Sequence, residues 1–353
     1  MNILYLINYA GNGGSEKYVK ILSDAMQKKG AKIFLAYNEG NGDILDFISP
    51  NYQINMKHPF DLLAAKKLSN LCDKLNIDII HAQFPRENYI SILSNIFKKR
   101  VVVYTSHINQ PNNFMWRMTN KFLTKKNAAI ISVCNSVKNL LIENNYPKEK
   151  IHVIYNGITP EIEKNEIQKN DVFTFVTLAR LSEEKGLMLL LESMKVVIES
   201  GSNCYLKIAG SGPLQNQLQE YITTNNLQNN IFLLGHVDTT KDLLLKSHVY
   251  INSSVHEALS FGILEAMSVG LPIIATRVGG NIDIIENANN GILVDRTTEN
   301  MSQAMKIFVN LKNDYKYNQN SIEATKTVFS LERTTNMTYE IYKKTIEEDY
   351  YVG

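Results

Sequence analysis

The chain of 353 residues is 44% hydrophobic and 20% charged, a composition typical of a soluble globular protein. Its length predicts two domains of similar size. No apolar run is long enough to span a bilayer, and the pattern of the first residues predicts a strand instead of a signal peptide. Cys72, Cys134 and Cys204 are odd in number and far apart, which indicates neither a disulfide framework nor a zinc site and favours a reducing cytosol.

The net charge of +2 is unevenly distributed along the chain. Residues 1–164 contain 21 Lys and Arg against 13 Asp and Glu, a net charge of +8, whereas residues 165–353 contain 16 against 22, a net charge of −6. A basic first half indicates an anionic partner, such as a membrane surface, a lipid-linked phosphate or a polyanionic acceptor. A basic face that is simply solvated explains the same charge, and this alternative stays open.

The first forty residues predict a strand–helix–strand unit, with the strand Ile3–Asn8, the helix Glu16–Lys29 and the strand Lys32–Ala36. The glycine-rich loop Tyr9–Ser15 allows a ligand to approach the backbone closely, and Ser15 is expected to cap the helix. Because the spacing differs from G-x-G-x-x-G, an ordinary tight turn is an equally good explanation.

Further strands and helices alternate up to residue 157. Strands are expected at residues 78–82, 100–105 and 128–134, a last strand with a turn at residues 151–157, and helices at residues 62–75 and 136–144. Strands that are apolar throughout and separated by helices indicate a parallel sheet covered on both faces, in which ligands gather at the carboxyl ends of the strands. His107 follows one such end, which makes it a candidate site residue, although a loop histidine with ordinary hydrogen bonds fits as well.

The segment Phe114–Lys126 combines aromatic and apolar side chains with Arg117, Lys121, Lys125 and Lys126. Such a cationic amphipathic helix is one way to dock on a membrane. A packed helix with a basic side in water has the same pattern, so both interpretations remain.

Residues 160–170 are polar and charged and form the best candidate for a linker. A second alternation follows, with strands at residues 172–178, 205–209 and 231–234 and helices at residues 186–200 and 214–225. The second half is therefore predicted to be another doubly wound α/β domain. Arg180 and Lys185 lie just past its first strand, where the guanidinium of one and the ammonium of the other suit a diphosphate. The alternative is a pair of surface cations screened by neighbouring acids.

The stretch Val249–Gly270 predicts a strand, a loop and a helix over Ile263–Val269, followed by a buried strand at residues 273–276. The start of a helix presents unpaired N–H groups that suit an anion. Glu257 lies in the loop and Glu265 in the helix, so both carboxylates are placed to accept hydrogen bonds from sugar hydroxyls. Taken alone, the two glutamates are better explained as an ordinary loop acid and an acid on a surface helix.

Six sequence blocks occur in order: G-N-G-G-S-E, L-A-R-L-S-E-E-K-G, A-G-S-G-P-L, F-L-L-G-H-V, E-A-L-S-F-G-I-L-E and A-M-S-V-G-L-P-I-I-A-T-R-V-G-G. Over nearly the whole chain they resemble the retaining glycosyltransferases of the GT-B fold, specifically family 4 with its E-x7-E pair. The resemblance implies an α/β chain with two Rossmann-like domains that face each other across a cleft. Residues 1–164 would bind the acceptor, residues 165–334 would bind a nucleotide-sugar, and residues 335–353 would form a helix that returns to the first domain.

The resemblance also implies roles for particular residues. Arg180 and Lys185 would hold the diphosphate of the donor, Glu257 would bind hydroxyls of its sugar and Glu265 would bind the ribose. Backbone N–H groups of Phe261, Gly262 and Ile263 would face the sugar and phosphate, and the backbone at His236 and Val237 would lie beside the base. From the first domain, Gly14 would approach the diphosphate and His107 the sugar near the reacting carbon.

By the same resemblance, the chain would move a hexose or N-acetylhexosamine from a nucleotide diphosphate sugar, foremost a UDP-sugar, to a glycan or lipid-linked acceptor in cell-envelope or glycan biosynthesis. The transfer would retain configuration by front-face, substrate-assisted substitution, with no metal and no cofactor. A 2-epimerase of nucleotide-sugars on the same fold and a catalytically silent partner protein are the alternatives. We expect a cytoplasmic protein with no nucleic-acid partner; peripheral contact with an anionic membrane and the oligomeric state stay open.

Overall fold

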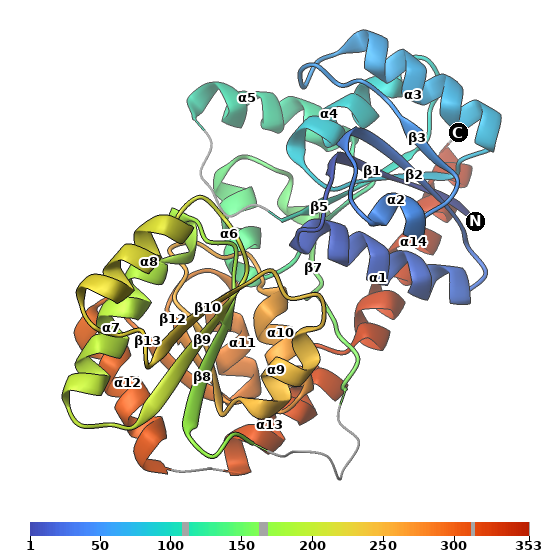
Figure 1. Cartoon of the computed structure of the whole chain (residues 1–353). Helices are drawn as coiled ribbons and strands as arrows, with labels where there is room; N and C mark the ends of the chain where they lie inside the picture. Colours follow the sequence, from blue (N-terminus) through green and yellow to red (C-terminus); the bar gives the residue numbers. More distant parts are fainter. Residues whose placement is uncertain (108–112, 162–168, 312–314, 353) are drawn as a thin grey trace. The chain divides into compact units, whose positions relative to one another are not determined.

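The computed structural model describes residues 1–107, 113–161, 169–311 and 315–352 (Figure 1). The chain divides into two compact units, one formed by residues 1–156 with residues 331–353 and the other by residues 157–330. The expected domain limit at residue 164 and much of the expected linker fall within residues 162–168, outside the described residues. None of the helices in the described part of the chain is both long and apolar enough to cross a membrane.

The first unit contains a parallel sheet in the order β3-β2-β1-β4-β5-β6-β7. From β1 the chain proceeds outward through β2 and β3, then returns to the other side of β1 with β4, so the strand order reverses between β1 and β4. The strands are β1 (Asn2–Ala10), β2 (Lys32–Gly40), β3 (Asn51–Gln53), β4 (Ile79–Ala82), β5 (Val101–Ser106), β6 (Ala129–Ser132) and β7 (Ile151–Val153).

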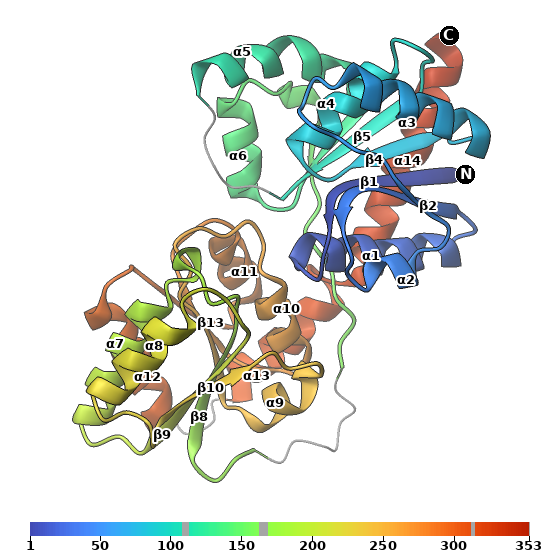
Figure 2. The same cartoon turned by 45° about the horizontal axis from the view of Figure 1, so that its top comes forward.

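Helices cover both faces of this sheet (Figures 1 and 2). Leu4 and Leu6 of β1 pack in one core with residues of α3 and α4, whereas Tyr5 between them points to the opposite face, where its hydroxyl lies 3.4 Å from that of Tyr342 in α14. The helices are α1 (Gly14–Lys28), α2 (Ile44–Phe47), α3 (Leu62–Leu75), α4 (Pro85–Ser94), α5 (Phe114–Leu123), α6 (Asn135–Glu143) and α14 (Leu331–Val352).

The C-terminal helix α14 is part of the first unit and begins at Leu331, four residues before the expected Thr335. The hydroxyl of Tyr342 lies 2.6 Å from Nδ1 of the buried His81 in β4, and Nε2 of that ring lies 2.6 Å from the hydroxyl of Thr105 in β5. Burial lowers the pKa of His81 to about 3, so its ring is neutral at pH 7 and joins helix and sheet as a hydrogen-bonding group.

The second unit contains a parallel sheet in the order β10-β9-β8-β11-β12-β13. Here the order reverses between β8 and β11, which are neighbours in the sheet although two other strands separate them in the chain. The strands are β8 (Phe173–Leu178), β9 (Cys204–Ala209), β10 (Ile231–Gly235), β11 (Val249–Asn252), β12 (Ile273–Thr276) and β13 (Gly291–Val294).

The helices of the second unit bury a continuous apolar core against its sheet. Leu190 and Met194 of α7 and Met305 of α12 pack with Leu206 and Ile208 of β9, and all five side chains are fully buried. The helices are α7 (Leu187–Glu199), α8 (Gln215–Thr224), α9 (Thr240–Lys246), α10 (Phe261–Ser268), α11 (Gly280–Ala288), α12 (Thr298–Leu311) and α13 (Tyr315–Lys326). The prediction of two doubly wound α/β domains with Rossmann-like parallel sheets is confirmed.

Candidate functional site

The centre of the candidate site is an ion pair between Lys185 and Glu257. Lys185 follows β8 and Glu257 follows β11, and because these strands are parallel neighbours, the loops after them leave the same edge of the sheet. The Nζ atom of Lys185 donates to Oε2 of Glu257 at 2.8 Å, and the hydroxyl of Ser254 donates to the same oxygen at 3.0 Å. The pair thus stands at the point where the strand order reverses, the usual ligand position in such sheets.

The two loops that carry this pair are held together through their backbones. Gly186 has a φ of +60°, and a Cβ atom there would lie 2.2 Å from the carbonyl oxygen of Ser253, so only glycine fits. The hydroxyl of Ser253 donates to the carbonyl of Lys185 at 2.8 Å, and the N–H of Val255 donates to the carbonyl of Glu184 at 2.7 Å. These contacts fix the distance between Lys185 and the loop of Glu257.

A buried network of polar side chains supports the loop after β11. Oδ1 of Asn252 accepts the N–H of Ser254 at 3.1 Å and the side-chain amide of Asn281 at 3.1 Å. The hydroxyl of Thr276 donates to the carbonyl of Ser254 at 2.7 Å. Sequence reasoning missed Asn252, Asn281 and Thr276; an asparagine that ends an otherwise apolar buried strand was the available signal.

The helix α10 begins at Phe261, two residues earlier than expected, because Ser260 caps it. The hydroxyl oxygen of Ser260 accepts the N–H of Ile263 at 3.4 Å, so this backbone donor, one of three expected to face a ligand, is engaged in the cap. A Cβ at Gly262 would lie 2.3 Å from the hydroxyl oxygen of Tyr250, which itself donates to the carbonyl of Leu178 at 3.2 Å. The first turn of α10 is therefore packed closely against the end of β8.

Glu265 lies one turn into α10 and is half-buried. Its Oε2 atom accepts a hydrogen bond from the hydroxyl of Thr240 at 2.9 Å. Thr240 is the first residue of α9, a helix that the sequence interpretation did not contain. The carboxylate is therefore oriented by a neighbour from another element.

Arg180, His236 and Val237 also lie past the carboxyl ends of strands of this sheet. Arg180 follows β8 and has an exposed side chain, while His236 and Val237 follow β10. His236 is exposed as well, with Nε2 3.4 Å from Oδ1 of Asp238. The structure places these three residues on the same edge as Lys185 and Glu257, because β10, β9 and β8 are successive parallel strands.

Gly14 belongs to the first unit, where it is the exposed first residue of α1. The expectation that Ser15 caps this helix is wrong. The cap position is Gly13, and the hydroxyl of Ser15, already inside the helix, donates to Oε2 of Glu16 at 2.9 Å. The loop before α1 is also shorter than expected, since β1 continues to Ala10.

His107 also belongs to the first unit and directly follows β5. Its Nε2 atom lies 3.0 Å from Oε1 of Gln83, whose side-chain nitrogen donates to the carbonyl of His81 at 3.4 Å. This orientation of Gln83 assigns the proton to Nε2 of His107 and leaves Nδ1 as an acceptor. Burial lowers the pKa of His107 to about 3, so the ring is neutral at pH 7.

Two charged residues near the reversal point of the first sheet were missed by sequence reasoning. Arg86, in the first turn of α4, donates from Nη1 to Oδ1 of Asn8 in β1 at 3.0 Å and so links the helix that follows β4 to β1. Glu87 is fully buried, and burial raises the pKa of its carboxyl to about 7. Arg86 and Glu87 begin the helix that follows β4, and His107 follows β5. Because β4 and β5 are parallel neighbours, all three residues lie at the same edge of the sheet.

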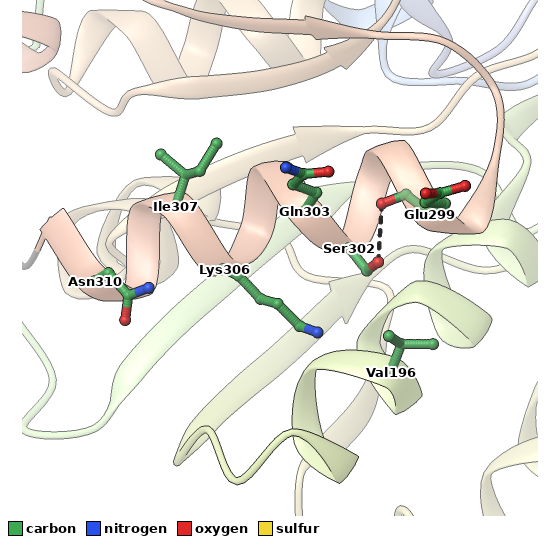
Figure 3. A pocket seen from close by; sticks show the side chains of 7 residues that line it. All are labelled: Val196, Glu299, Ser302, Gln303, Lys306, Ile307 and Asn310. Atoms are coloured by element: carbon green, nitrogen blue, oxygen red, sulfur yellow. Dashed lines mark hydrogen bonds between the residues drawn. The ribbon is translucent and has the colours of Figure 1, made fainter.

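A hollow of about 640 Å³ lies elsewhere in the second unit, along α12 and beside α7 (Figure 3). Its lining contains none of the predicted site residues; it consists of Val196, Glu299, Ser302, Gln303, Lys306, Ile307 and Asn310. The candidate site is therefore defined by the strand edge and its side-chain contacts, not by this hollow.

Comparison with known proteins gives two family models that match successive parts of the chain: Glycosyltransferase Family 4 over residues 12–162 and Glycosyl transferases group 1 over residues 159–328. An uncharacterized glycosyltransferase of Methanocaldococcus jannaschii is 37% identical over 156 residues, which span 43% of this chain but only 38% of that protein. The Escherichia coli UDP-Gal:alpha-D-GlcNAc-diphosphoundecaprenol alpha-1,3-galactosyltransferase is 27% identical over 272 residues, 70% of each chain. Anabaena HepE, solved in complex with UDP, has a similar fold, with a TM-score of 0.84 and 17% identity over 98% of this chain and 100% of that one.

Proposed function

We propose that the chain, whose successive parts match the Glycosyltransferase Family 4 and Glycosyl transferases group 1 models, is a glycosyltransferase of the GT-B type. In this proposal it transfers a hexose or N-acetylhexosamine from a nucleotide diphosphate sugar to a glycan or lipid-linked acceptor. The observation that carries this proposal is the Lys185–Glu257 ion pair at the reversal point of the second sheet. A cation and a carboxylate held side by side there match the two ends of a sugar diphosphate, one anionic and one rich in hydroxyl donors.

In the proposed donor complex, Lys185 and the exposed Arg180 bind the diphosphate. Both charges also offset the negative charge that develops on the leaving phosphate as the bond to the sugar breaks, so they act mainly in the transition state. Glu257 accepts hydrogen bonds from sugar hydroxyls and Glu265 from the ribose. Because Glu257 is already bound by Lys185 and Ser254, it is suited to orienting the sugar and not to attacking it.

We propose that the transfer retains the configuration of the anomeric carbon and needs no metal. The bond from that carbon to the diphosphate oxygen breaks, the acceptor hydroxyl oxygen bonds to the carbon on the same face, and its proton passes to the departing phosphate oxygen. No side chain then has to serve as nucleophile or base. His107, the candidate from the first unit, is neutral and its Nε2 is held by Gln83, so it is suited to serve as a hydrogen-bonding group and not as a base.

The proposed donor is a UDP-sugar and the proposed acceptor class is found in cell-envelope or glycan biosynthesis. The name of the Escherichia coli relative specifies a UDP-sugar donor and a diphosphoundecaprenol-linked acceptor for that protein, and its match covers 70% of both chains. HepE, a protein of the same fold, binds UDP. Both observations support the proposal for this chain.

A thermal-shift screen tests the proposal. UDP, GDP and ADP, each with and without an attached sugar, are added to the purified chain. A ligand at a hundred times its dissociation constant adds about 2.7 kcal/mol to the free energy of unfolding, which raises the midpoint measurably. We expect UDP and a UDP-sugar to raise the midpoint and Lys185→Ala to abolish the shift. A screen in which no nucleotide acts would contradict a donor site and favour a silent partner protein, whereas conversion of the nucleotide-sugar into its 2-epimer would identify an epimerase.

A further inference from the structure

The first unit carries an exposed surface on which apolar and basic side chains are combined. In α5, Phe114, Met115, Met118 and Phe122 are 79%, 64%, 36% and 65% exposed. Large apolar side chains so open to water, repeated on one helix, require an apolar partner to be covered. Single exposed apolar residues are common, but four within nine residues are not explained by chance exposure.

The arrangement of α5 separates the two kinds of side chain into neighbouring stripes. Phe114, Met118 and Phe122 are spaced by four residues and so form one line along the helix. Arg117 and Lys121 are also spaced by four and form a second line beside the first. Apolar side chains with cations next to them are the pattern of a helix that lies in the interface of a bilayer.

The start of α3 extends this surface. Phe60 stacks on Trp116 of α5 with 5.8 Å between ring centroids, so the residues that precede α3 adjoin α5. Leu62 and Leu63, in the first turn of α3, are 55% and 76% exposed. One turn later come the exposed Lys66 and Lys67. The helices α3, α4 and α5 lie on the same side of the first unit in both views (Figures 1 and 2).

Charge indicates what covers this surface. Residues 62–72 and residues 113–126 contain no acidic side chain and carry two and four cations respectively. Asp61, between Phe60 and Leu62, is buried, and its carboxylate accepts the N–H of Ala64 as the cap of α3. A surface whose exposed side chains are apolar or cationic complements a bilayer that contains anionic phospholipids, since the headgroups attract the cations and the acyl boundary receives the apolar groups. A protein partner would have to be equally apolar and acidic.

We propose that this surface docks the first unit on an anionic phospholipid bilayer. The surface is formed by Phe60, Leu62, Leu63, Lys66, Lys67, Phe114, Met115, Arg117, Met118, Lys121 and Phe122. The residues before α3 and the start of α5 follow the carboxyl ends of β3 and β5, so this edge of the first sheet is brought to the headgroups. If the proposed sugar transfer holds, a lipid-linked acceptor would be presented there. The docking itself does not depend on that activity.

The chain contains a single tryptophan, Trp116 of α5, which stacks on the buried Tyr89 and on Phe60 of the docking surface. Vesicles of phosphatidylcholine with phosphatidylglycerol are therefore expected to change its fluorescence and to sediment with the full chain, whereas vesicles of phosphatidylcholine alone bind weakly. Each cation near an anionic surface contributes about five-fold to the partition coefficient. Arg117→Gln with Lys121→Gln should thus lower partitioning about 25-fold, and Phe114→Ser with Phe122→Ser should lower it at least as much.

Matched controls come from the second unit. Ile307 and Leu311 are apolar side chains of α12 with 42% and 46% exposure, and Lys241 and Lys326 are exposed lysines. Ile307→Ser with Leu311→Ser, and Lys241→Gln with Lys326→Gln, should leave partitioning unchanged. Equal binding by the α5 variants and the wild-type chain, or no binding to anionic vesicles at all, would overturn the proposal. A donor-induced thermal shift on the same preparations separates this failure from a failure of the proposed transfer.

Discussion

Lys185 and Glu257 are 72 residues apart in the chain, yet Nζ of the first lies 2.8 Å from Oε2 of the second. The side chains are 24% and 12% exposed, so the pair is partly withdrawn from water while still reachable by a ligand. Each charge holds the other in position, and the close approach of their loops leaves little freedom to separate. Such preorganised charges are more effective in a transition state than mobile ones in water.

The first prediction concerns this pair. Lys185→Ala should lower the rate of sugar transfer by about 10²–10³-fold, as removal of one transition-state stabiliser typically does. Glu257→Gln, which keeps an acceptor for Ser254 but removes the charge, should lower it as well. Lys195→Ala is the matched control, because Lys195 also pairs with a glutamate in this unit, the exposed Glu199, but at 3.8 Å, and it donates to Oδ1 of Asn225 away from the site.

Transfer by all three variants is measured with a radiolabelled donor, beside their urea unfolding curves. Lys195→Ala should unfold within about 1 kcal/mol of the wild-type chain, since exposed ion pairs contribute little to stability. Lys185→Ala and Glu257→Gln remove one charge from a largely buried pair, so they should lose more, up to about 3 kcal/mol, while remaining folded in the transfer assay. Wild-type rates for Lys185→Ala would sink the assignment of the site.

The second prediction concerns Gly186. Gly186→Ala has to place a Cβ 2.2 Å from the carbonyl oxygen of Ser253 at a φ of +60°. Gly201→Ala is the matched control, because Gly201 also has a positive φ, +87°, but no heavy atom within 4 Å of the Cβ position. The control should cost about 1–2 kcal/mol for the backbone conformation alone. Gly186→Ala should cost more and should also lower transfer, because the loop of Glu257 must move; equal unfolding free energies would contradict the close approach.

Much of the fold could be predicted because buried parallel strands are apolar along their whole length. β5 and β6 were located to within two residues at either end, and α3 was predicted from Leu62 to Leu75, as observed. The edge strands β3 and β13 were missed: β3 consists of Asn, Tyr and Gln and has no apolar run, and only the last residue of β13 is buried. The helices α9, α11, α12 and α13 were also absent from the interpretation, although α12 has a clear apolar face.

The site was predictable where it depends on order along the chain, and not where it depends on contacts between side chains. Lys185 and Glu257 follow adjacent strands, so their proximity follows from the topology. The partners that hold the site come from other elements: Thr240 for Glu265, and Asn281 for the loop after β11. No spacing in the sequence predicts such contacts, because they form only when the helices pack against the sheet.

The third prediction concerns Glu265. Its hydrogen bond from Thr240 orients the carboxylate proposed to bind the ribose. Glu265→Ala should weaken nucleotide binding by about 10–100-fold, the loss of one or two hydrogen bonds to a charged group. Thr240→Val, which removes only the orienting hydroxyl, should weaken it less. Calorimetric titration with UDP measures both, and the exposed Glu286→Ala of α11 serves as control; unchanged affinity in Glu265→Ala would remove this residue from the donor site.

The fourth prediction concerns the buried His81. Its pKa of about 3 in the folded chain compares with about 6.5 in the unfolded chain, so below pH 6.5 only the unfolded state takes up this proton. The stabilising effect of the neutral ring is complete above pH 6.5 and is lost as the pH falls towards 3, by up to about 1.4 kcal/mol per pH unit. His81→Gln should therefore flatten the decline of unfolding free energy between pH 6 and pH 4, even though it weakens the contacts to Tyr342 and Thr105. His256→Gln, at an exposed position, is the control and should keep the wild-type decline of unfolding free energy with pH. A decline in His81→Gln as steep as in the wild-type chain would mean that the ring of His81 already takes up protons in the folded chain.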